Sequence, residues 1–315
     1  MKAKPDITIL IPLYNEDESL PHLKKALDEM LERESIKAEL LFVNDGSRDN
    51  SEQLLDEFAR SDSRVRVVHF RRNRGKSAAL EAGFRQAKGA YVVTMDADLQ
   101  DDPNEVPNLI KKLEEGFDLV SGWKKKRHDP ITKTAPSKLF NFVARITSGV
   151  KLHDLNCGLK IYRREVLGTI QLYGELHRFI PILVAGEGWR VGELVVQHHA
   201  RRWGRTKFGV SRFLPGFLDL LTVLFLTRFA ARPMHLFGSL GLLTGITGFG
   251  ILVYLSVLWF SGIAIGHRPL LTFGVLLVIV GLQFFSLGLI GEMITHHHAS
   301  LRLLSSKDGE DPDAP

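Results

Sequence analysis

Hydrophobic and polar residues follow two alternating patterns in the first 212 residues of the chain. Short runs rich in Val, Ile, Leu and aromatic residues have the composition of buried strands. They are Ile7–Leu13, Glu39–Val43, Val65–Phe70, Ala90–Met95 and Leu119–Gly122. Amphipathic segments with helical spacing lie between them, at Ser19–Arg33, Glu52–Arg60, Ser77–Lys88 and Asn104–Glu115, with Ser51 as a helix cap. Strands that alternate with helices predict an α/β domain with a mainly parallel sheet, in which ligands bind beyond the carboxyl ends of the strands.

A different pattern begins after Arg212, where charged residues become rare. Met234–Phe260 and Leu270–Gly291 carry no Asp, Glu, Lys or Arg, and each is long enough to cross a hydrocarbon core of about 30 Å as a helix. Ser261–Pro269 between them predicts a hairpin turn. Glycines recur at short spacing from Gly238 to Gly248, which allows close helix contact and predicts a homo-oligomer. Two buried core helices of a soluble protein are the alternative, but such helices are seldom apolar on every side.

Basic residues gather in the large domain and beside the apolar stretches, whereas the hairpin carries only Arg268. By the positive-inside rule, the large domain and both termini are expected in the cytoplasm. Pro215, Asp219 and Arg228 interrupt the apolar segment before the first crossing, which predicts helices that lie in the membrane interface. The expected organisation is an α/β domain over 1–212, interfacial helices over 213–232, a transmembrane hairpin over 233–294 and a partly disordered cytoplasmic tail over 295–315.

The net charge of +5 suits phosphate-bearing ligands or an anionic lipid surface. The same charge suits nucleic acid, but no helix-turn-helix pattern or aromatic sheet platform accompanies it, so a nucleic-acid partner is not expected. The single cysteine, Cys157, excludes an intramolecular disulfide and favours a cytosolic domain.

The most informative motif is Met95–Asp102, with the sequence MDADLQDD at the end of a predicted strand. In extended backbone, alternate side chains share a face, so Asp96, Asp98 and Gln100 are expected to point the same way. Three hard oxygen donors at the carboxyl end of a strand suit Mg²⁺ or Mn²⁺, which completes its shell with substrate phosphates. The alternative is a solvated acidic turn before a helix, with Asp102 as the helix cap.

Two other predicted strands also run into polar turns, at Ile9–Glu16 (ILIPLYNE) and Leu41–Ser47 (LFVNDGS). Three such turns at one sheet edge predict a nucleotide pocket, in which an aspartate can accept from ribose hydroxyls or a base edge, although each alone fits an ordinary turn. Basic clusters occur at Arg71–Lys76, Lys124–Arg127 and His198–Lys207. A solvated charged face explains the first two clusters as well as phosphate binding does, although the position of the second, directly after a predicted strand, favours the site. The alternative for the third is a basic patch on the membrane surface. The last cluster, just before the membrane segments, also suits a clamp on a lipid phosphate.

In this order, the motifs resemble those of family 2 glycosyltransferases with the GT-A fold. The resemblance rests on PLYNE, VNDGS, the Asn73–Gly75 turn and MDADLQ. The later R-x-x-G-x-T-K of Arg201–Lys207, followed by two crossings, is similar to the branch of dolichyl- and undecaprenyl-phosphate sugar transferases. The resemblance implies inverting, metal-dependent transfer of a hexose from a nucleotide diphosphate-sugar, such as UDP-glucose or GDP-mannose. The acceptor would be undecaprenyl or dolichyl phosphate at the cytoplasmic membrane face.

The resemblance also implies roles for individual residues. Binding of the nucleotide-sugar falls to Pro12, Tyr14, Glu16, Asp45, Lys76, Asp96 and Asp98. The ligands of Mg²⁺ or Mn²⁺ are Asp96, Asp98 and Gln100. The acceptor phosphate is expected at Lys124, Lys133, Ser137, Arg201 and Lys207. The expected catalytic residues are Asp98, Arg201 and Asp154, and whether Asp154 acts as a base stays open.

Two other functions fit part of the pattern. A processive polysaccharide synthase shares the early motifs but carries Gln-x-x-Arg-Trp and more crossings, whereas Gln197 and Arg202–Trp203 lie too far apart here. A catalytically silent membrane scaffold that only binds a nucleotide-sugar is the other alternative, and metal-dependent turnover would distinguish an enzyme from it.

Overall fold

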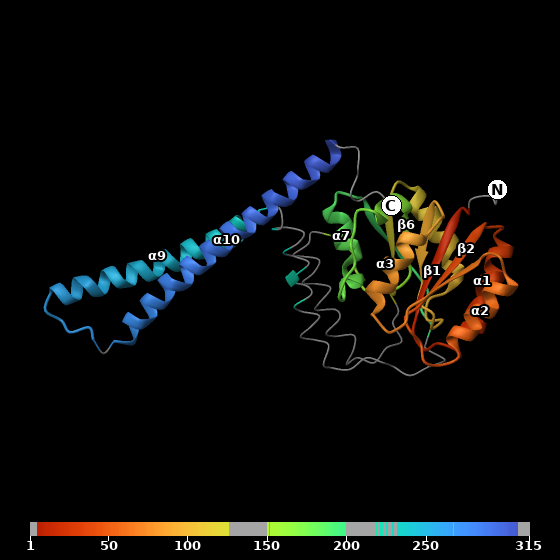
Figure 1. Cartoon of the computed structure of the whole chain (residues 1–315), viewed down its shortest axis with the longest axis horizontal. Coiled ribbons are helices and arrows are strands. Elements are labelled where there is room, and N and C mark those ends of the chain that lie inside the picture. The colour runs from red at the N-terminus through yellow and green to blue at the C-terminus, as the bar shows by residue number, and fades with distance from the viewer. Residues whose placement is uncertain are drawn as a thin grey trace. The chain divides into compact units, whose positions relative to one another are not determined.

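The computed structural model describes residues 5–125, 150, 152–199, 218, 221–222, 225, 229, 232–266 and 268–307, with side chains described up to residue 297. The chain divides into two compact units, Met1–Val223 and Leu224–Ala314. The first is built around a sheet with helices, and the second is a helical hairpin (Figure 1).

A seven-stranded sheet forms the centre of the first unit, in the order β3-β2-β1-β4-β6-β5-β7. The strands are β1 (Ile7–Leu13), β2 (Ala38–Asn44), β3 (Val65–His69), β4 (Tyr91–Thr94), β5 (Leu119–Trp123), β6 (Lys160–Arg163) and β7 (Val191–Val195). β1 is parallel to β2 and β4, β2 is parallel to β3, and β5 is parallel to β7. Of these seven strands, only β6 is antiparallel to its neighbours, β4 and β5. The predicted α/β class with a mainly parallel sheet is confirmed.

Helices cover both faces of this sheet. The longer ones are α1 (Leu20–Arg33), α2 (Ser51–Ser61), α3 (Lys76–Gln86) and α4 (Val106–Glu114). Successive strand side chains point to opposite faces. Ile7, Ile9 and Ile11 of β1 therefore join the buried cluster that includes residues of α1, α2 and α4. Leu10 faces α3 instead, where a Cβ on Gly83 would lie only 2.2 Å from Leu10 Cδ1.

Local turn chemistry sets where two of these helices begin. Ser51, predicted as a helix cap, is the first residue of α2, and its hydroxyl accepts the backbone N–H of Glu16 (3.0 Å) instead of capping the helix. α4 begins later than the sequence predicts because a 3-10 turn, η1 (Pro103–Glu105), precedes it. The remaining described elements of the unit are α6 (Arg164–Leu167), η2 (Leu176–Phe179) and α7 (Ile180–Gly186), which follow β6.

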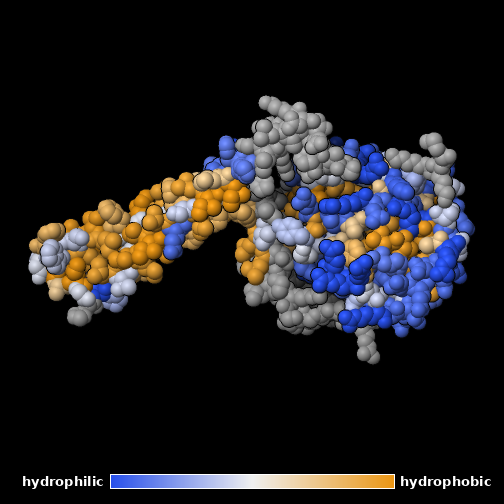
Figure 2. Space-filling view, in the orientation of Figure 1, coloured by the Kyte–Doolittle hydropathy of each residue, from blue (hydrophilic) through white to orange (hydrophobic). Residues whose placement is uncertain are grey.

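The second unit consists of α9 (Pro233–Phe260) and α10 (Pro269–Lys307). Two spans are long and apolar enough to cross a membrane, Pro233–Phe260 with a mean hydropathy of 1.9 and Pro269–His297 with 2.4. Apolar side chains cover the surface of the hairpin, whereas the described surface of the α/β unit is largely hydrophilic (Figure 2). Large apolar side chains such as Ile246 (68% exposed) and Phe260 (81% exposed) lie open, unlike those of the core helices of a soluble protein.

Glycines bring the two helices of the hairpin into backbone contact. A Cβ on Gly241 would lie 2.7 Å from the carbonyl oxygen of Gly281, and a Cβ on Gly248 would lie 2.7 Å from that of Gly274. Because these glycines pack α9 against α10 within one chain, their spacing no longer argues for self-association. The homo-oligomer stays a prediction.

Candidate active site

The turns after β1 and β2 lie at one edge of the sheet, because the two strands are parallel. Ser47 Oγ accepts the N–H of Asn15 (2.9 Å), and Asn15 Oδ1 accepts the N–H of Arg48 (2.8 Å). Asn15 has a φ of 53°, a conformation that asparagine adopts more readily than most residues. The flanking residues Tyr14 and Glu16, predicted to bind the nucleotide, therefore belong to a turn that is fixed against the β2 turn.

Asp45, at the end of β2, forms hydrogen bonds with a third turn, the one that precedes α3. Its carboxylate accepts the backbone N–H groups of Arg74 (2.7 Å) and Gly75 (2.9 Å), just before α3. Burial raises the pKa of Asp45, and the two N–H donors oppose that rise. Gly46 has a φ of +67°, and a Cβ there would lie 2.5 Å from the carbonyl carbon of Arg72, so this position requires glycine. What the structure establishes for Asp45 is that it holds the turn before α3; its contact with a nucleotide stays a prediction.

The acidic motif forms a turn beyond β4. β4 ends at Thr94, and Leu99 has a φ of 57°. The expectation that Asp96, Asp98 and Gln100 share one face of an extended strand is therefore wrong, because the backbone leaves the extended conformation before the motif is complete. Asp98 is buried, and its Oδ1 accepts the backbone N–H of Gln100 (3.1 Å). The three oxygen-bearing side chains remain within one short turn at the carboxyl edge.

Hydrogen bonds to Gln100 and Asp102 hold the end of this turn in place. Asp102 Oδ1 accepts the N–H of Asn104 (2.9 Å), the helix-capping role that the alternative interpretation gave it. The backbone N–H of His199 donates to the carbonyl oxygen of Gln100 (2.9 Å), and His199 Nε2 lies 3.1 Å from Asp102 Oδ2. The start of the basic cluster 198–207 thus lies directly against the acidic motif.

Lys76, the first residue of α3, forms an ion pair with Asp96. Each side chain is about one-third exposed, at 34% and 33%. Burial alone would raise the pKa of Asp96, but Lys76 lowers it to about 2, so Asp96 is ionised at neutral pH. The structure thus brings together two residues that were predicted to bind the nucleotide-sugar.

Lys124, at the end of β5, pairs with Asp101 at 2.7 Å. This pair is buried, with side-chain exposures of 13% and 0%. Burial alone would lower the pKa of Lys124, but the adjacent Asp101 carboxylate raises it above the ordinary lysine value. Lys124 therefore carries a positive charge next to the acidic motif, and its predicted contact with the acceptor phosphate stays a prediction.

A small pocket of about 20 Å³ opens beside the Lys76–Asp96 pair. Its walls come from the ends of β1 and β4, the first turns of α3, the loop before β6, β6 itself and the η2–α7 segment. The lining residues are Pro12, Lys76, Leu80, Thr94, Met95, Asp96, Asn156, Cys157, Gly158, Lys160, Tyr162, His177 and Ile180. Three predicted donor-site residues, Pro12, Lys76 and Asp96, therefore share one cavity.

Sequence reasoning missed three polar residues of this pocket: Lys160, Tyr162 and His177. Lys160 and Tyr162 belong to β6, which was not predicted, and both are buried. His177 Nδ1 lies 3.0 Å from Ser77 Oγ, and burial, reinforced by Lys76 and Arg178, lowers its pKa to about 2, so it is neutral. The only sequence signal was a lysine within an apolar run, Leu159–Tyr162.

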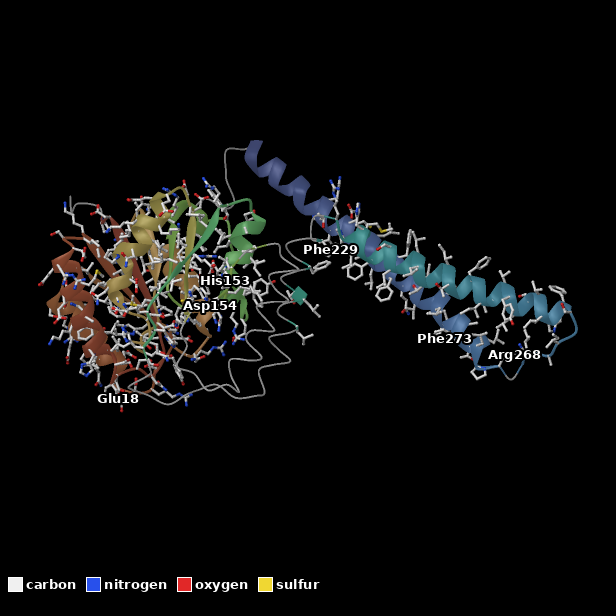
Figure 3. All side chains as sticks on the ribbon, turned by 180° about the vertical axis from the view of Figure 1, so that it is seen from behind. Glu18, His153, Asp154, Phe229, Arg268 and Phe273 are labelled. Atoms are coloured by element: carbon white, nitrogen blue, oxygen red, sulfur yellow. The ribbon has the colours of Figure 1, made fainter. Side chains whose placement is uncertain are left out.

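Asp154 is buried in the loop before β6, where its Oδ1 accepts the N–H of Asn156 (3.2 Å). Its neighbour His153 stacks on Trp123 with ring centroids 4.1 Å apart and contacts Glu193 through Nδ1 at 2.5 Å. Figure 3 labels His153 and Asp154 side by side in the α/β unit. Asp154 thus stands next to Asn156–Gly158, which line the pocket, although it does not line the pocket itself.

Four predicted residues lie outside the described part of the chain. They are Lys133, Ser137, Arg201 and Lys207. Their assignment to the acceptor phosphate, and the catalytic role of Arg201, stay predictions.

The acidic motif suits a divalent metal ion by its donor chemistry. Asp96 and Asp98 offer carboxylates and Gln100 an amide oxygen, which are donors that Mg²⁺ and Mn²⁺ prefer. Among the described residues, no group of three His, Cys, Asp or Glu side chains lies close enough to hold a metal ion. Mg²⁺ often needs only one or two carboxylates, because substrate phosphates and water complete its shell. The residues therefore fit a metal that binds together with a nucleotide diphosphate.

The model of the family "Glycosyl transferase family 2" matches residues 8–170. The chain is 40% identical over 295 residues to the dodecaprenyl-phosphate galacturonate synthase of Rhizobium johnstonii, covering 92% of this chain and 87% of the relative. It is 35% identical to the undecaprenyl-phosphate 4-deoxy-4-formamido-L-arabinose transferase of Pseudomonas fluorescens, covering 94% and 86%. Both relatives are named as polyprenyl-phosphate sugar transferases.

A solved structure of similar fold is glucosyl-3-phosphoglycerate synthase from Mycobacterium tuberculosis in complex with Mn²⁺ and UDP-glucose. Its TM-score is 0.55 at 21% identity, covering 72% of this chain and 80% of that one. At this identity the likeness concerns the fold alone. The matched family model, the two relatives and the arrangement of the sheet agree with the motifs at its carboxyl edge, and the chain belongs to glycosyl transferase family 2, with a catalytic unit of the GT-A fold.

Proposed function

We propose that this enzyme transfers one sugar from a nucleotide diphosphate-sugar to a polyprenyl phosphate at the cytoplasmic face of a membrane. The proposal rests on two features of one chain. The Lys76–Asp96 ion pair and its pocket lie at the carboxyl edge of the sheet, and two helices are long enough to span a membrane. The similarity to two polyprenyl-phosphate sugar transferases over most of the chain supports it.

The nucleotide-sugar is assigned to the three hydrogen-bonded turns that follow β1, follow β2 and precede α3. Pro12, Tyr14, Glu16 and Asp45 would receive the nucleoside, and Lys76 the diphosphate. Mg²⁺ or Mn²⁺ would be held by Asp96, Asp98 and Gln100, and when bound it neutralises charge on the leaving nucleoside diphosphate. Fixed turns favour catalysis because donors that are already oriented need no reorganisation during the reaction.

The acceptor provides its own nucleophile. The second pKa of a phosphate monoester is about 6, so polyprenyl phosphate is largely a dianion at neutral pH and needs no general base. In a single inverting displacement, an acceptor phosphate oxygen bonds to the anomeric carbon while the bond from that carbon to the β-phosphate oxygen breaks. The bonding electrons leave with the nucleoside diphosphate. Lys124, Lys133, Ser137, Arg201 and Lys207 are the residues proposed to hold the acceptor phosphate.

Asp154 has no proton to remove in this reaction. We assign it to positioning the loop before β6, because its carboxylate accepts the N–H of Asn156, which lines the pocket. Asp98, through the metal ion that it would hold, and Arg201, by contact with the reacting phosphates, are the proposed catalytic residues.

The hairpin would hold the enzyme where its lipid substrate lies. A polyprenyl phosphate stays in the bilayer, so its phosphate is reached at the membrane interface. α9 and α10 would cross the membrane twice, with the turn that contains Arg268 on the far side and both termini in the cytoplasm. Basic residues before α9 would lie at the headgroups.

Membership of the family does not identify the sugar, because the two relatives are named for different sugars. We expected a glucose or mannose donor, but the relatives are named for galacturonate and for 4-deoxy-4-formamido-L-arabinose. A single pentose or hexose unit, neutral or charged, is therefore the proposed substrate class.

The test uses purified enzyme in detergent with undecaprenyl phosphate and a panel of radiolabelled UDP- and GDP-sugars. Label should enter a lipid of polyprenyl-phosphate character, and EDTA should abolish the transfer. Release of free polymer would indicate a processive synthase, whereas binding of donor without turnover would indicate a scaffold. Either result would reject the proposed function.

A further inference from the structure

β6 presents two buried polar side chains to the pocket. Lys160 and Tyr162 are two positions apart in a strand, so their side chains share one face of the sheet. They are 3% and 0% exposed, and both line the pocket beside Asp96. The ring of Tyr162 packs edge-on against Phe84 of α3, with centroids 5.4 Å apart, which fixes its position.

Both side chains have hydrogen-bonding capacity that the protein leaves unused. The ammonium group of Lys160 has three donors, and it donates to the carbonyl oxygen of Cys157. In the described part of the chain, Lys160 forms no ion pair, whereas Lys76 and Lys124 each pair with an aspartate. The hydroxyl of Tyr162 is buried without a hydrogen-bond partner of normal geometry among the described residues. Unsatisfied buried polar groups of this kind are rare in folded proteins.

The charges around the pocket favour an anion at this place. Burial lowers the pKa of Lys160 and the charge of Lys76 lowers it further, while the charges of Asp154 and Asp96 oppose that fall. The charge of Asp96 is already compensated by Lys76. An anionic ligand beside Lys160 would offset the cost of burying its charge.

We propose that Lys160 and Tyr162 form a subsite for a carboxylate on the transferred sugar, so that the donor is a nucleotide diphosphate-hexuronate. The inference rests on the proposed function, since it specifies the sugar for the same transfer. A carboxylate has one negative charge and two acceptor oxygens, which matches one ammonium and one hydroxyl donor. Burial raises the pKa of Tyr162, which keeps its donor proton in place.

The diphosphate of the donor is the other source of anionic oxygen. The diphosphate carries more negative charge than one buried ammonium balances. It is served by Lys76, which is about one-third exposed, and by the oxygen-bearing side chains that suit a metal. The buried, single-charge character of the Lys160 subsite therefore favours the sugar carboxylate.

The test compares donors that differ only at the carboxylate. The pairs are UDP-galacturonate with UDP-galactose, UDP-glucuronate with UDP-glucose, and GDP-mannuronate with GDP-mannose, each with undecaprenyl phosphate. The wild-type enzyme should prefer one hexuronate over its neutral partner by about 100-fold in kcat/KM, because the neutral sugar leaves buried polar groups unpaired. Lys160→Met should reduce this preference at least tenfold, mainly by lowering kcat/KM for the hexuronate. Lys111→Met, an exposed lysine on α4, is the matched control and should keep it.

Tyr162→Phe is the second variant. Among the described residues its hydroxyl makes no hydrogen bond of normal geometry, so its removal should change the melting temperature little. It should also reduce the preference for the hexuronate. An equal loss with charged and neutral donors in Lys160→Met would assign Lys160 to the diphosphate and overturn the carboxylate subsite. Preference of the wild type for a neutral sugar would also overturn it, while leaving the proposed function intact. No transfer from any of the six donors would overturn the subsite, and the proposed function falls as well when the wider panel of UDP- and GDP-sugars also gives no labelled lipid.

Discussion

Gly158 offers a way to displace the acidic motif without changing any charge. It lies just before β6, and its carbonyl oxygen accepts the hydroxyl of Thr94 (2.9 Å). A Cβ at this position would lie 2.5 Å from Asp96 Oδ2 and 3.1 Å from Asp101 Oδ2. Ordinary contact begins at 3.4 Å, so in Gly158→Ala the Asp96 carboxylate must withdraw by about 0.9 Å. Because Gly158 does not have a positive φ, alanine suits the backbone itself.

A misplacement of about 1 Å at a reacting centre can cost about 100-fold in rate. We therefore expect Gly158→Ala to lower kcat/KM for sugar transfer by about 100-fold, which corresponds to about 2.7 kcal/mol of transition-state stabilisation. The assay is transfer of labelled sugar to undecaprenyl phosphate, with thermal unfolding measured on the same preparations.

Gly168→Ala is the matched control, because the nearest atom to its added Cβ is the carbonyl oxygen of Glu165 at 3.9 Å. Its activity should stay within about twofold of wild type. A folded Gly158→Ala enzyme with wild-type kcat/KM would refute the reasoning, since it would mean that the position of Asp96 does not matter for the reaction.

Three further predictions concern the charged groups of the site. Lys124→Met should lower the free energy of unfolding by about 3–5 kcal/mol, because it strands the buried carboxylate of Asp101; denaturant titration measures this, and an unchanged midpoint would contradict the buried ion pair. His177 has a folded-state pKa lowered from 6.5 to about 2, so the unfolded state binds the extra proton and stability should fall as the pH drops below 6.5. The slope from this residue approaches about 1.4 kcal/mol per pH unit, and it should disappear in His177→Gln; equal slopes would show that the histidine titrates normally. Asp98→Ala should abolish EDTA-sensitive transfer, whereas Asp154→Asn should lose much less activity, and an equal collapse of two folded variants would indicate a required base.

The sequence predicted those strands that are marked by the hydrophobic pattern of their own residues. β1 to β5 are apolar runs between polar turns, and β1 has the predicted bounds. β6 has only four residues and includes Lys160, and β7 contains a glycine, so neither has a clear strand pattern. β6 is a strand because it is inserted between β4 and β5, which come earlier in the chain. That pairing depends on tertiary structure and has no counterpart in local periodicity.

The residues of the candidate site also divide into those that local sequence patterns predicted and those that they did not. The acidic motif, Asp45 and Lys76 were found because each follows or precedes a strand or turn of recognisable form. The subsite formed by Lys160 and Tyr162 was missed because its meaning depends on burial against α3 and on the absence of a partner in the described structure. Even for the acidic motif, the expected extended backbone was wrong, because Leu99 turns the chain within it.

In the proposed reaction, the sugar is accepted by a lipid phosphate that acts as its own nucleophile. The most direct measurement compares transfer to undecaprenyl phosphate with transfer to undecaprenol, which has the same chain but ends in a hydroxyl, under identical detergent and donor conditions. We expect a lipid product from the phosphate, with the mass of one added sugar residue, and none from the alcohol. Equal transfer to both lipids, or transfer to the alcohol alone, would contradict it.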